Sequence, residues 1–280
     1  MIAVTFDVDD VAWVSGAPFD EMASIVPCIL DVLDGFPQVK TTWFIRLDAG
    51  IENRRGRADA LFEDYADVID RMRSSGHEIG WHHHAVVAGT PNQPSGDVAR
   101  TYRELTKLAP IVRAYGVSSV RLGWAQSSAE IVQCLSELGF AVDSTALPRP
   151  AYPWDAVVRD WKPNSMQPYH PSIADHRVGG APANAILEVP MSVAEVTLPT
   201  DTVPGVRRYL NLAYHTHLFQ HALAQVNTLP VIVTVSHPYE FAAHASEHPL
   251  LAFNLATLST NVRLLHESRR GFITMRSLVN

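Results

Sequence analysis

Short apolar runs rich in β-branched residues alternate along the chain with amphipathic stretches, and this alternation predicts strands and helices in turn. Repeated strand–helix units are typical of a parallel sheet in which helices connect successive strands. The predicted strands are 2–6, 41–45, 77–82, 119–123, 140–144, 186–190, 231–236 and 271–275. The predicted helices are 20–34, 59–75, 96–115, 126–138, 205–227 and 248–269.

The number of these units predicts the fold class. Seven or eight of them in 280 residues fit an α/β fold of the distorted (β/α)7–8 barrel type, as one domain over residues 1–280. An open doubly wound sheet is the alternative. No glycine-rich phosphate loop follows the first strand, which argues against a nucleotide-binding function.

Residues 146–184 interrupt the alternation with seven prolines and few helix signals. Long loops inside compact domains are usually functional or disordered, and disordered segments are poor in aromatic residues. This segment contains Tyr152, Trp154, Trp161 and Tyr169. We therefore expect an ordered lid or rim beside the active site, although a surface excursion that only covers one barrel end is the alternative.

Composition and charge narrow the class of protein. With 47% hydrophobic and 18% charged residues, the chain is typical of a globular protein with a sizeable core. The net charge of −7, without a basic block, argues against nucleic acid or an anionic membrane as partner. The sequence has no long apolar run and no secretory signal, so we expect a cytoplasmic protein. Cys28 and Cys134 are expected to be two separate, buried thiols and not a disulfide.

Polar side chains gather at the ends of the predicted strands. The C-terminal strand ends of such a barrel lie on one face, where catalytic residues collect, so these side chains should converge. They are Asp7, Asp9, Asp10, His82, His83, His84, Arg121, Trp124, Asp143 and His237.

The first strand ends in closely spaced carboxylates. Asp7 and Asp9 are two residues apart and face the same side of an extended chain. Two carboxylates so close require a cation or an arginine nearby to remain ionised. Acidic residues after a strand can also cap the following turn, and this is the better interpretation for Asp10.

The third predicted strand ends in three adjacent histidines. If the segment stays extended, His82 and His84 share a face and His83 points away. Two imidazoles and one carboxylate with an open fourth position are typical of catalytic zinc, and iron uses a similar set. His237 follows an apolar strand and is a candidate general acid, or a histidine bonded to a backbone carbonyl.

Six segments together resemble the NodB-type polysaccharide deacetylases, carbohydrate esterase family 4. They are "VTFDVDD", "GHEIGWH", "SVRLGW", "AVDSTAL", "ILEVP" and "TVSHPYE", in the family's order over nearly the whole chain. The resemblance implies a distorted barrel with one divalent metal ion held by an aspartate and two histidines. Zinc is the usual ion, with Ni²⁺, Co²⁺ or Fe²⁺ as alternatives.

The resemblance also assigns roles to residues. Asp7 corresponds to the catalytic base, Asp9 to a metal ligand and His82 to the first metal histidine. Arg121 corresponds to the arginine that fixes the base. Asp143 occupies the place of a supporting acid, and His237 that of the general acid.

The chain departs from the family pattern at two places. The family's second metal histidine lies four residues after the first, where this chain has Val86, so either His84 or His83 replaces it or the metal site is altered. The aspartates of the first strand are separated, as Asp-x-Asp, whereas the commoner pattern has them adjacent. This form resembles the branch that contains amide hydrolases and deformylases.

These features predict a metal-dependent hydrolase that removes an N-acyl group, above all N-acetyl, from a small amine-bearing substrate such as an amino sugar or biosynthetic intermediate. One alternative is an enzyme of the same fold that cuts a ureide, formamide or cyclic amide. Another is a non-catalytic binding protein. The aromatic side chains that could stack on substrate are Trp13, Trp124, Tyr152 and Trp154.

Overall fold

A computed structural model describes residues 1–10, 13–14, 17–87, 93–155, 157–162, 164–180, 185–244 and 247–279, without the side chains of residues 13, 14, 17 and 18. Its centre is a parallel sheet of seven strands in the order β11-β1-β4-β5-β6-β7-β8. Their bounds are β1 (Ile2–Val8), β4 (Thr41–Arg46), β5 (Glu78–His83), β6 (Ser119–Leu122), β7 (Val142–Asp143), β8 (Leu187–Glu188) and β11 (Ile232–Ser236).

The sheet curls into a barrel because the last strand returns beside the first. β11 pairs with β1 in parallel, from Ile2 opposite Ile232 to Phe6 opposite Ser236. On the far side no regular ladder joins β8 to β11 within the described chain. Instead, the Ser192 amide donates to the Val233 carbonyl (3.2 Å) and the Val233 amide donates to Ser192 Oγ (2.9 Å). The predicted distorted (β/α) barrel is confirmed.

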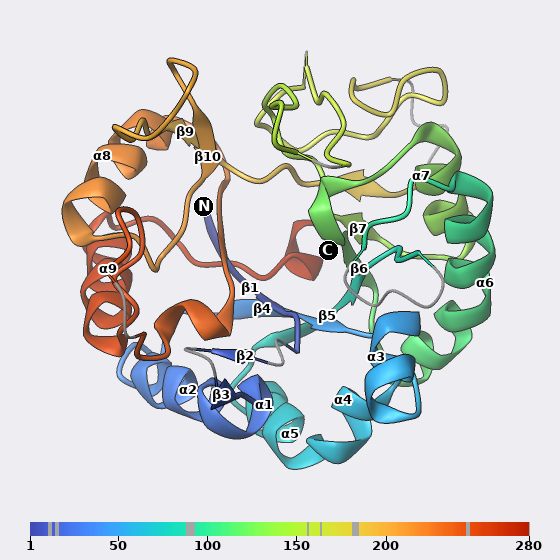
Figure 1. The fold of residues 1–280 in the computed structure, drawn as a ribbon, viewed down its shortest axis with the longest axis horizontal. Coiled ribbons are helices and arrows are strands. Elements are labelled where there is room, and N and C mark those ends of the chain that lie inside the picture. Colours follow the sequence, from blue (N-terminus) through green and yellow to red (C-terminus); the bar gives the residue numbers. More distant parts are fainter. Residues whose placement is uncertain are drawn as a thin grey trace.

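Helices surround this barrel on its outside (Figure 1). Parallel strands covered on both faces are apolar throughout, and every residue of β1 and β4 is buried. The helices are α1 (Glu21–Ser24), α2 (Val26–Asp34), α3 (Ala49–Arg55), α4 (Ala60–Asp64), α5 (Ala66–Ser74), α6 (Val98–Ala114), α7 (Ala129–Glu137), α8 (Thr216–Val226) and α9 (Leu255–Glu267). Two short antiparallel pairs are added, β2 (Trp13–Val14) with β3 (Ala17–Pro18) and β9 (Val193–Glu195) with β10 (Arg207–Tyr209).

Two predicted elements differ from the structure. The predicted strand 271–275 is wrong: only an isolated bridge joins Phe272 to Ile2, and Met275 is buried against the sheet without a ladder. The first part of the predicted helix 205–227 is wrong too, because Arg207–Tyr209 pairs with β9 and the helix begins at Thr216. The apolar positions are buried as expected, but the neighbouring segment, not the local pattern, decides the backbone conformation.

The proline-rich segment 146–184 crosses one end of the barrel (Figure 1). Its described residues make only isolated bridges, one of which joins Tyr169 to Glu188 of β8. Trp161 is fully buried, and its indole N–H donates to the Ala125 carbonyl (2.9 Å). Buried aromatic side chains therefore hold this segment on the barrel.

Two further observations concern the whole described chain. Cys28 and Cys134 are separate free thiols, as expected, but only Cys134 is buried, and Cys28 is partly exposed. None of the helices in the described ranges is both long and apolar enough to cross a membrane.

Candidate metal centre and active site

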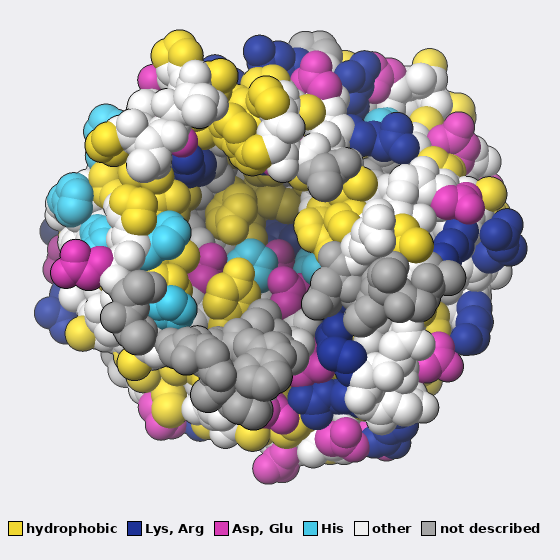
Figure 2. Space-filling view, in the orientation of Figure 1, with side chains coloured by type: hydrophobic (Ala, Val, Ile, Leu, Met, Phe, Trp, Pro, Cys, Tyr) yellow, Lys and Arg dark blue, Asp and Glu magenta, His cyan; other side chains and the backbone are white. Residues whose placement is uncertain are grey.

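A cavity of about 310 Å³ opens at the C-terminal ends of the strands. Figure 2 shows this hollow, with acidic and histidine side chains inside it. Most of the predicted site residues line it, although they come from strands far apart in the sequence. They are Asp7, Asp9, His82, His84, Arg121, Trp124 and His237.

Three potential metal ligands converge within this cavity. Asp9 Oδ1 lies 3.1 Å from His82 Nε2 and 3.2 Å from His84 Nε2, and the two nitrogens are 2.9 Å apart. Ligands at about 2.0–2.1 Å from a tetrahedral zinc ion are about 3.3–3.4 Å apart, close to these separations. The three atoms therefore have about the spacing of three ligands around one zinc ion.

The hydrogen bonds of these side chains also fit a cation. His82 Nδ1 lies 2.8 Å from the Arg121 carbonyl, which can only accept, so Nδ1 carries a proton and Nε2 is the ring nitrogen that faces the cluster. Asp9 Oδ1 is buried and has no hydrogen-bond partner in the described residues. A divalent ion would satisfy this oxygen and both nitrogens at once.

The charges of the ligands agree with this interpretation. Burial and the nearby Arg46 guanidinium lower the pKa of His84 to about 4, so the imidazole is neutral, as a metal ligand must be. Burial opposes the ionisation of Asp9, but the His84 and His82 rings outweigh it and hold the pKa of this carboxyl well below its usual range. The cluster thus contains an ionised Asp9 carboxylate and a neutral His84 imidazole.

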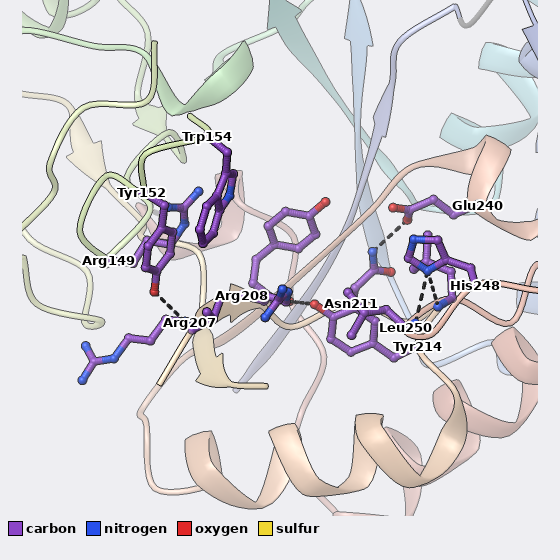
Figure 3. Close-up of a pocket in the computed structure, with 13 residues that line it drawn as sticks. Arg149, Tyr152, Trp154, Arg207, Arg208, Asn211, Tyr214, Glu240, His248 and Leu250 are labelled. Atoms are coloured by element: carbon purple, nitrogen blue, oxygen red, sulfur yellow. Dashed lines mark hydrogen bonds between the residues drawn. The ribbon is translucent and has the colours of Figure 1, made fainter. Parts of the chain in front are cut away.

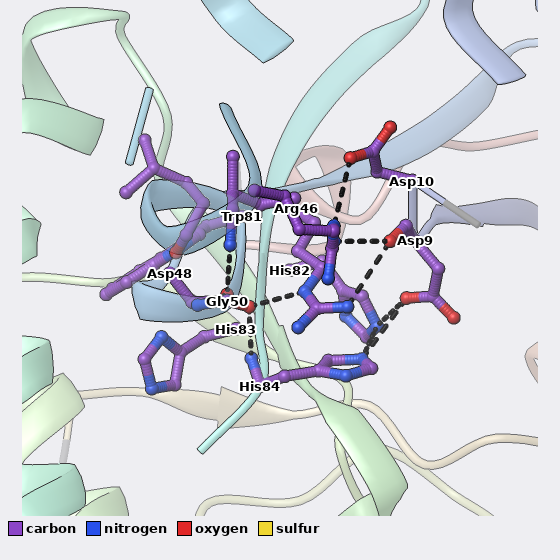
Figure 4. Close-up of polar contacts among 12 residues, drawn as sticks. Asp9, Asp10, Arg46, Asp48, Gly50, Trp81, His82, His83 and His84 are labelled. Atoms are coloured by element: carbon purple, nitrogen blue, oxygen red, sulfur yellow. Dashed lines mark hydrogen bonds and ion pairs between the residues drawn. The ribbon is translucent and has the colours of Figure 1, made fainter. Parts of the chain in front are cut away.

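His83 lies on the opposite side of the strand from this cluster (Figure 4). Its buried ring packs against Trp81, with centroids 5.4 Å apart, and Nε2 lies 3.8 Å from Glu104 Oε2. Val86, at the position where a second metal histidine was expected, is buried in a bridge to Pro94. Of the two candidates for the missing ligand, the structure brings His84 to Asp9 and His82.

Other elements hold the His84 ring in place. The backbone amide of His84 donates to Asp48 Oδ2 (3.0 Å), and Asp48 Oδ1 also accepts from the amide of Gly50 at the start of α3 (2.6 Å). The Trp124 ring lies over the imidazole, with centroids 4.2 Å apart. Gly123 leaves the room for the ring, since a Cβ there would lie 2.1 Å from His84 Cδ2.

Asp7 and Arg121 form a buried ion pair beside the ligand cluster. The Arg121 guanidinium donates to Asp7 Oδ1 (2.7 Å) and to Thr5 Oγ1 (2.7 Å), and on its other side to the Ser144 carbonyl (2.9 Å). It also lies over the Phe44 ring, 4.4 Å from its centroid. These contacts fix the guanidinium, which in turn orients the Asp7 carboxylate in the cavity wall.

His237 lies on the other side of Asp9. Its Nε2 is 3.6 Å from Asp9 Oδ2, and its Nδ1 is 3.4 Å from Glu240 Oε1. Glu240 is fixed because its Oε2 accepts from the His237 amide (2.8 Å) and from the Asn211 side chain (2.9 Å). Burial alone would lower the pKa of His237, but the carboxylates of Glu240, Asp9 and Asp7 raise it to about 10, so this ring is protonated at neutral pH.

Asp143 lies behind the cavity and is not in its wall. It is fully buried, opposite Glu188 in the β7–β8 register, and its Oδ1 accepts from the Thr145 amide (3.1 Å). Burial raises the pKa of Asp143 to about 6, and burial together with the Asp143 charge raises the pKa of Glu188 well above its usual range. A role of Asp143 in catalysis stays a prediction.

The remaining predicted residues lie elsewhere. Asp10 forms ion pairs with Arg54 and Arg55 of α3, consistent with a structural role. Tyr152 and Trp154 line a neighbouring cavity and not the one with the ligand cluster, so their role in substrate binding stays a prediction. The Trp13 side chain lies outside the described part of the structure.

Sequence reasoning did not identify four residues that shape the site: Asp48, Gly123, Glu188 and Glu240. Glu240 had a local signal, because an acidic residue three positions after His237 fits a capping box, which the structure contains. Gly123 had none, since its importance depends on the distance to His84.

Comparisons with solved structures agree with this architecture. A Mycobacterium smegmatis protein assigned as a polysaccharide deacetylase aligns with 99% of this chain and 87% of its own, with a TM-score of 0.58 and 18% identity. The chain shares the fold of this deacetylase. At this identity the likeness concerns the fold and not the reaction.

Two other solved structures align less well. A Bordetella bronchiseptica protein assigned as a polysaccharide deacetylase involved in O-antigen biosynthesis has a TM-score of 0.39 and 19% identity, over 87% of this chain and 74% of that one. A family 4 carbohydrate esterase from Streptomyces lividans, in complex with acetate, has a TM-score of 0.47 and 10% identity, over 97% and 90%. No protein-family model and no curated protein matches the sequence.

Proposed function

We propose that this protein is a metal-dependent hydrolase that removes an acyl group, in the first place acetyl, from the nitrogen of a small amine-bearing substrate. The observation that supports it most strongly is the convergence of Asp9, His82 and His84 between a buried aspartate–arginine pair and a protonated histidine. The cavity volume of about 310 Å³ lies at the lower end of the range for small-molecule sites.

Asp9, His82 and His84 would hold the metal ion. A bound divalent cation polarises an acyl oxygen and lowers the pKa of a coordinated water toward about 7. The three side chains leave the cavity side open, as catalytic zinc sites with three protein ligands do. The chemistry then depends on the residues on either side of the ligands.

Asp7 is the proposed base. Arg121 engages its Oδ1, and in the described residues its Oδ2 has no hydrogen-bond partner, so that oxygen is free to accept the proton of the attacking water. Water oxygen forms the new bond to the acyl carbon as its proton passes to Asp7.

His237 is the proposed acid. The C–N bond cannot break to an amine anion at a reasonable rate, so the nitrogen must gain a proton as it leaves. The imidazolium of His237 faces the cavity across Asp9 and is held by Glu240. Donation of its Nε2 proton gives a free amine and a carboxylic acid, which balances the addition of water.

The test combines metal analysis with hydrolysis. The purified protein should contain stoichiometric metal and release acetate from N-acetyl amino sugars. Asp9→Ala and His82→Ala should lose the metal. Asp7→Asn should keep it but react about 10²–10⁴-fold more slowly. His217→Ala, on the surface of α8 away from the ligands, is the matched control.

Two results would refute the proposal. One is a wild-type protein without stoichiometric metal, and the other is Asp7→Asn at the full wild-type rate. Ureides and formamides belong in the same substrate panel, because release of ammonia or formate in place of acetate would assign the enzyme to a different C–N bond.

A further inference from the structure

A second cavity, of about 230 Å³, adjoins the one that holds the ligand cluster. Arg149 and Tyr209 line both. Glu240 lines the second cavity and pairs with His237 of the first. Figure 3 shows Tyr152 and Trp154 on one side of this cavity and Glu240, His248 and Leu250 on the other. A substrate that reacts in the first cavity can therefore extend into the second.

One wall of this second cavity is an aromatic platform fixed from several directions. Tyr152 and Trp154 are stacked, with centroids 4.7 Å apart and planes within 11°. The Tyr152 hydroxyl accepts from the Arg207 amide (2.7 Å), and the Arg149 guanidinium lies 4.7 Å from the centre of its ring. Trp154 is 51% exposed although its neighbour is fixed. Such a preorganised aromatic face suits a flat or ring-shaped ligand.

Of the described arginines that line this cavity, two are paired with carboxylates. Arg149 is neutralised by two hydrogen bonds to Asp155 (2.7 and 3.1 Å). Arg208 is neutralised in the same way by Asp201 (2.5 and 3.1 Å). Glu240 Oε1 lies 3.4 Å from His237 Nδ1, and Glu240 Oε2 accepts from the Asn211 side chain (2.9 Å).

Arg207 remains. It is exposed at the cavity wall, next to the platform, and its guanidinium has no partner in the parts of the chain that the structure describes. An arginine guanidinium matches phosphate and carboxylate groups by donating two hydrogen bonds.

From these observations, and resting on the proposed function, we infer that the substrate carries an anionic group, phosphate or carboxylate, on a ring that extends beyond the acyl nitrogen. The ring stacks on Trp154 and the anionic group pairs with Arg207, while the acylamino group lies between Asp7 and His237. The second cavity thus selects an acidic amine-bearing substrate over its neutral counterpart.

The test measures binding separately from turnover. Metal-free protein is titrated by calorimetry with glucosamine, with glucosamine 6-phosphate as the phosphate probe and with muramic acid as the carboxylate probe. At least one acidic sugar should bind about tenfold more tightly than glucosamine, and this preference should weaken with added salt. Comparison of the two acidic probes shows which anionic group the cavity takes.

Variants locate the effect. Arg207→Gln should reduce the preference for the acidic sugar about tenfold. Trp154→Ala should weaken binding of the acidic sugar about fivefold. Arg263→Gln, an exposed arginine of α9 that lines neither cavity, is the control and should leave binding unchanged.

The two proposals fail differently. Equal binding of neutral and acidic sugars, or a preference that survives Arg207→Gln, overturns the inference about the second cavity even if acetate is released from N-acetylglucosamine. An Arg207-dependent preference without any hydrolysis of the N-acetylated forms supports the cavity and refutes the proposed reaction.

Discussion

Gly123→Ala tests whether His84 is a metal ligand. A Cβ at this position would lie 2.1 Å from Cδ2 and 2.3 Å from Nε2 of the His84 ring. Ordinary van der Waals contact begins near 3.4 Å, so the ring must move by about 1.3 Å. The neighbouring Trp124 and Ala125 have φ angles of 54° and 50°, a restricted backbone that cannot easily move away.

The expected loss of metal affinity follows from this displacement. Metal–ligand distances vary by only about 0.2 Å between sites. A His84 ring that moves by about 1.3 Å therefore no longer coordinates the metal. Loss of an outer-shell partner alone costs about 10–100-fold in affinity, so loss of a direct ligand should cost at least about 100-fold, or about 2.8 kcal/mol.

The measurement is zinc affinity, by competition with a chromophoric chelator. Gly96→Ala is the matched control, because a Cβ at Gly96 meets nothing within 4 Å. Denaturant unfolding of the metal-free proteins separates a local effect on the site from a general loss of stability. Wild-type affinity in Gly123→Ala would refute the reasoning.

A double-mutant cycle gives a second, independent reading. Once His84→Ala has removed the ring, the extra methyl group at position 123 has nothing to displace. The double variant should therefore bind zinc as weakly as His84→Ala alone. Additive losses would show that the methyl group acts by another route.

Three further predictions concern a buried ion pair, the identity of the metal ligands and the protonation of a buried histidine. Arg121→Met should lower the free energy of unfolding of the metal-free protein by about 3–5 kcal/mol in urea denaturation, because Asp7 stays buried without its partner. His83→Leu should keep the stoichiometric metal that His82→Leu loses, as measured by elemental analysis, because the His83 ring faces away from the cluster. Protonation of His77 should lower the free energy of unfolding of the wild-type protein by up to about 3 kcal/mol between pH 6.5 and pH 4. His77→Asn should lack this loss, measured as the difference from wild type.

The direction of the pH effect follows from the hydrogen bonds of His77. Its Nδ1 accepts from the Thr41 amide (3.1 Å), and burial lowers the pKa of this ring to about 4. Since the folded pKa lies below the unfolded value near 6.5, the stabilisation is complete above pH 6.5 and is lost as the pH falls toward 4. Asparagine retains an acceptor there but cannot titrate, so an unchanged pH profile would contradict the assignment.

The predictions for Arg121→Met and His83→Leu have controls of their own. Arg57→Met removes an exposed ion pair with Asp64 and should cost no more than about 1 kcal/mol, and an equal loss in both arginine variants would remove the special role of burial. If His83→Leu also lost its metal while staying folded, strand alternation would not have identified the ligands.

The sequence determined the barrel and the face that carries the site. Strands such as β1 and β4 are buried at every position, which is characteristic of parallel strands covered on both faces. The C-terminal ends of such strands carry Asp9, His82 and His237. The position of a residue relative to a strand end is a local property of the sequence. Local pattern is therefore enough to bring them to the same end of the barrel.

Local pattern failed where a distant segment decides the conformation. Residues 207–209 are a strand because β9 lies beside them, whereas 271–275 makes only the isolated bridge from Phe272 to Ile2 and packs Met275 against the sheet. The sequence identified Tyr152 and Trp154 as candidate substrate-binding residues but did not place them. The path of the loop places them in the adjoining cavity.

Only the tertiary structure decided which histidine joins Asp9 and His82. Alternation along the strand separates His83 from His84, but it does not show that the His84 ring has space to reach the cluster. That space exists because Gly123, on the next strand's C-terminal turn, has no side chain. The pairs of His237 with Glu240 and Asp143 with Glu188 likewise set proton positions through burial and distance. A sequence fixes the kinds of groups available, but pKa and ligand geometry depend on separations of a few ångströms between elements, which only packing establishes.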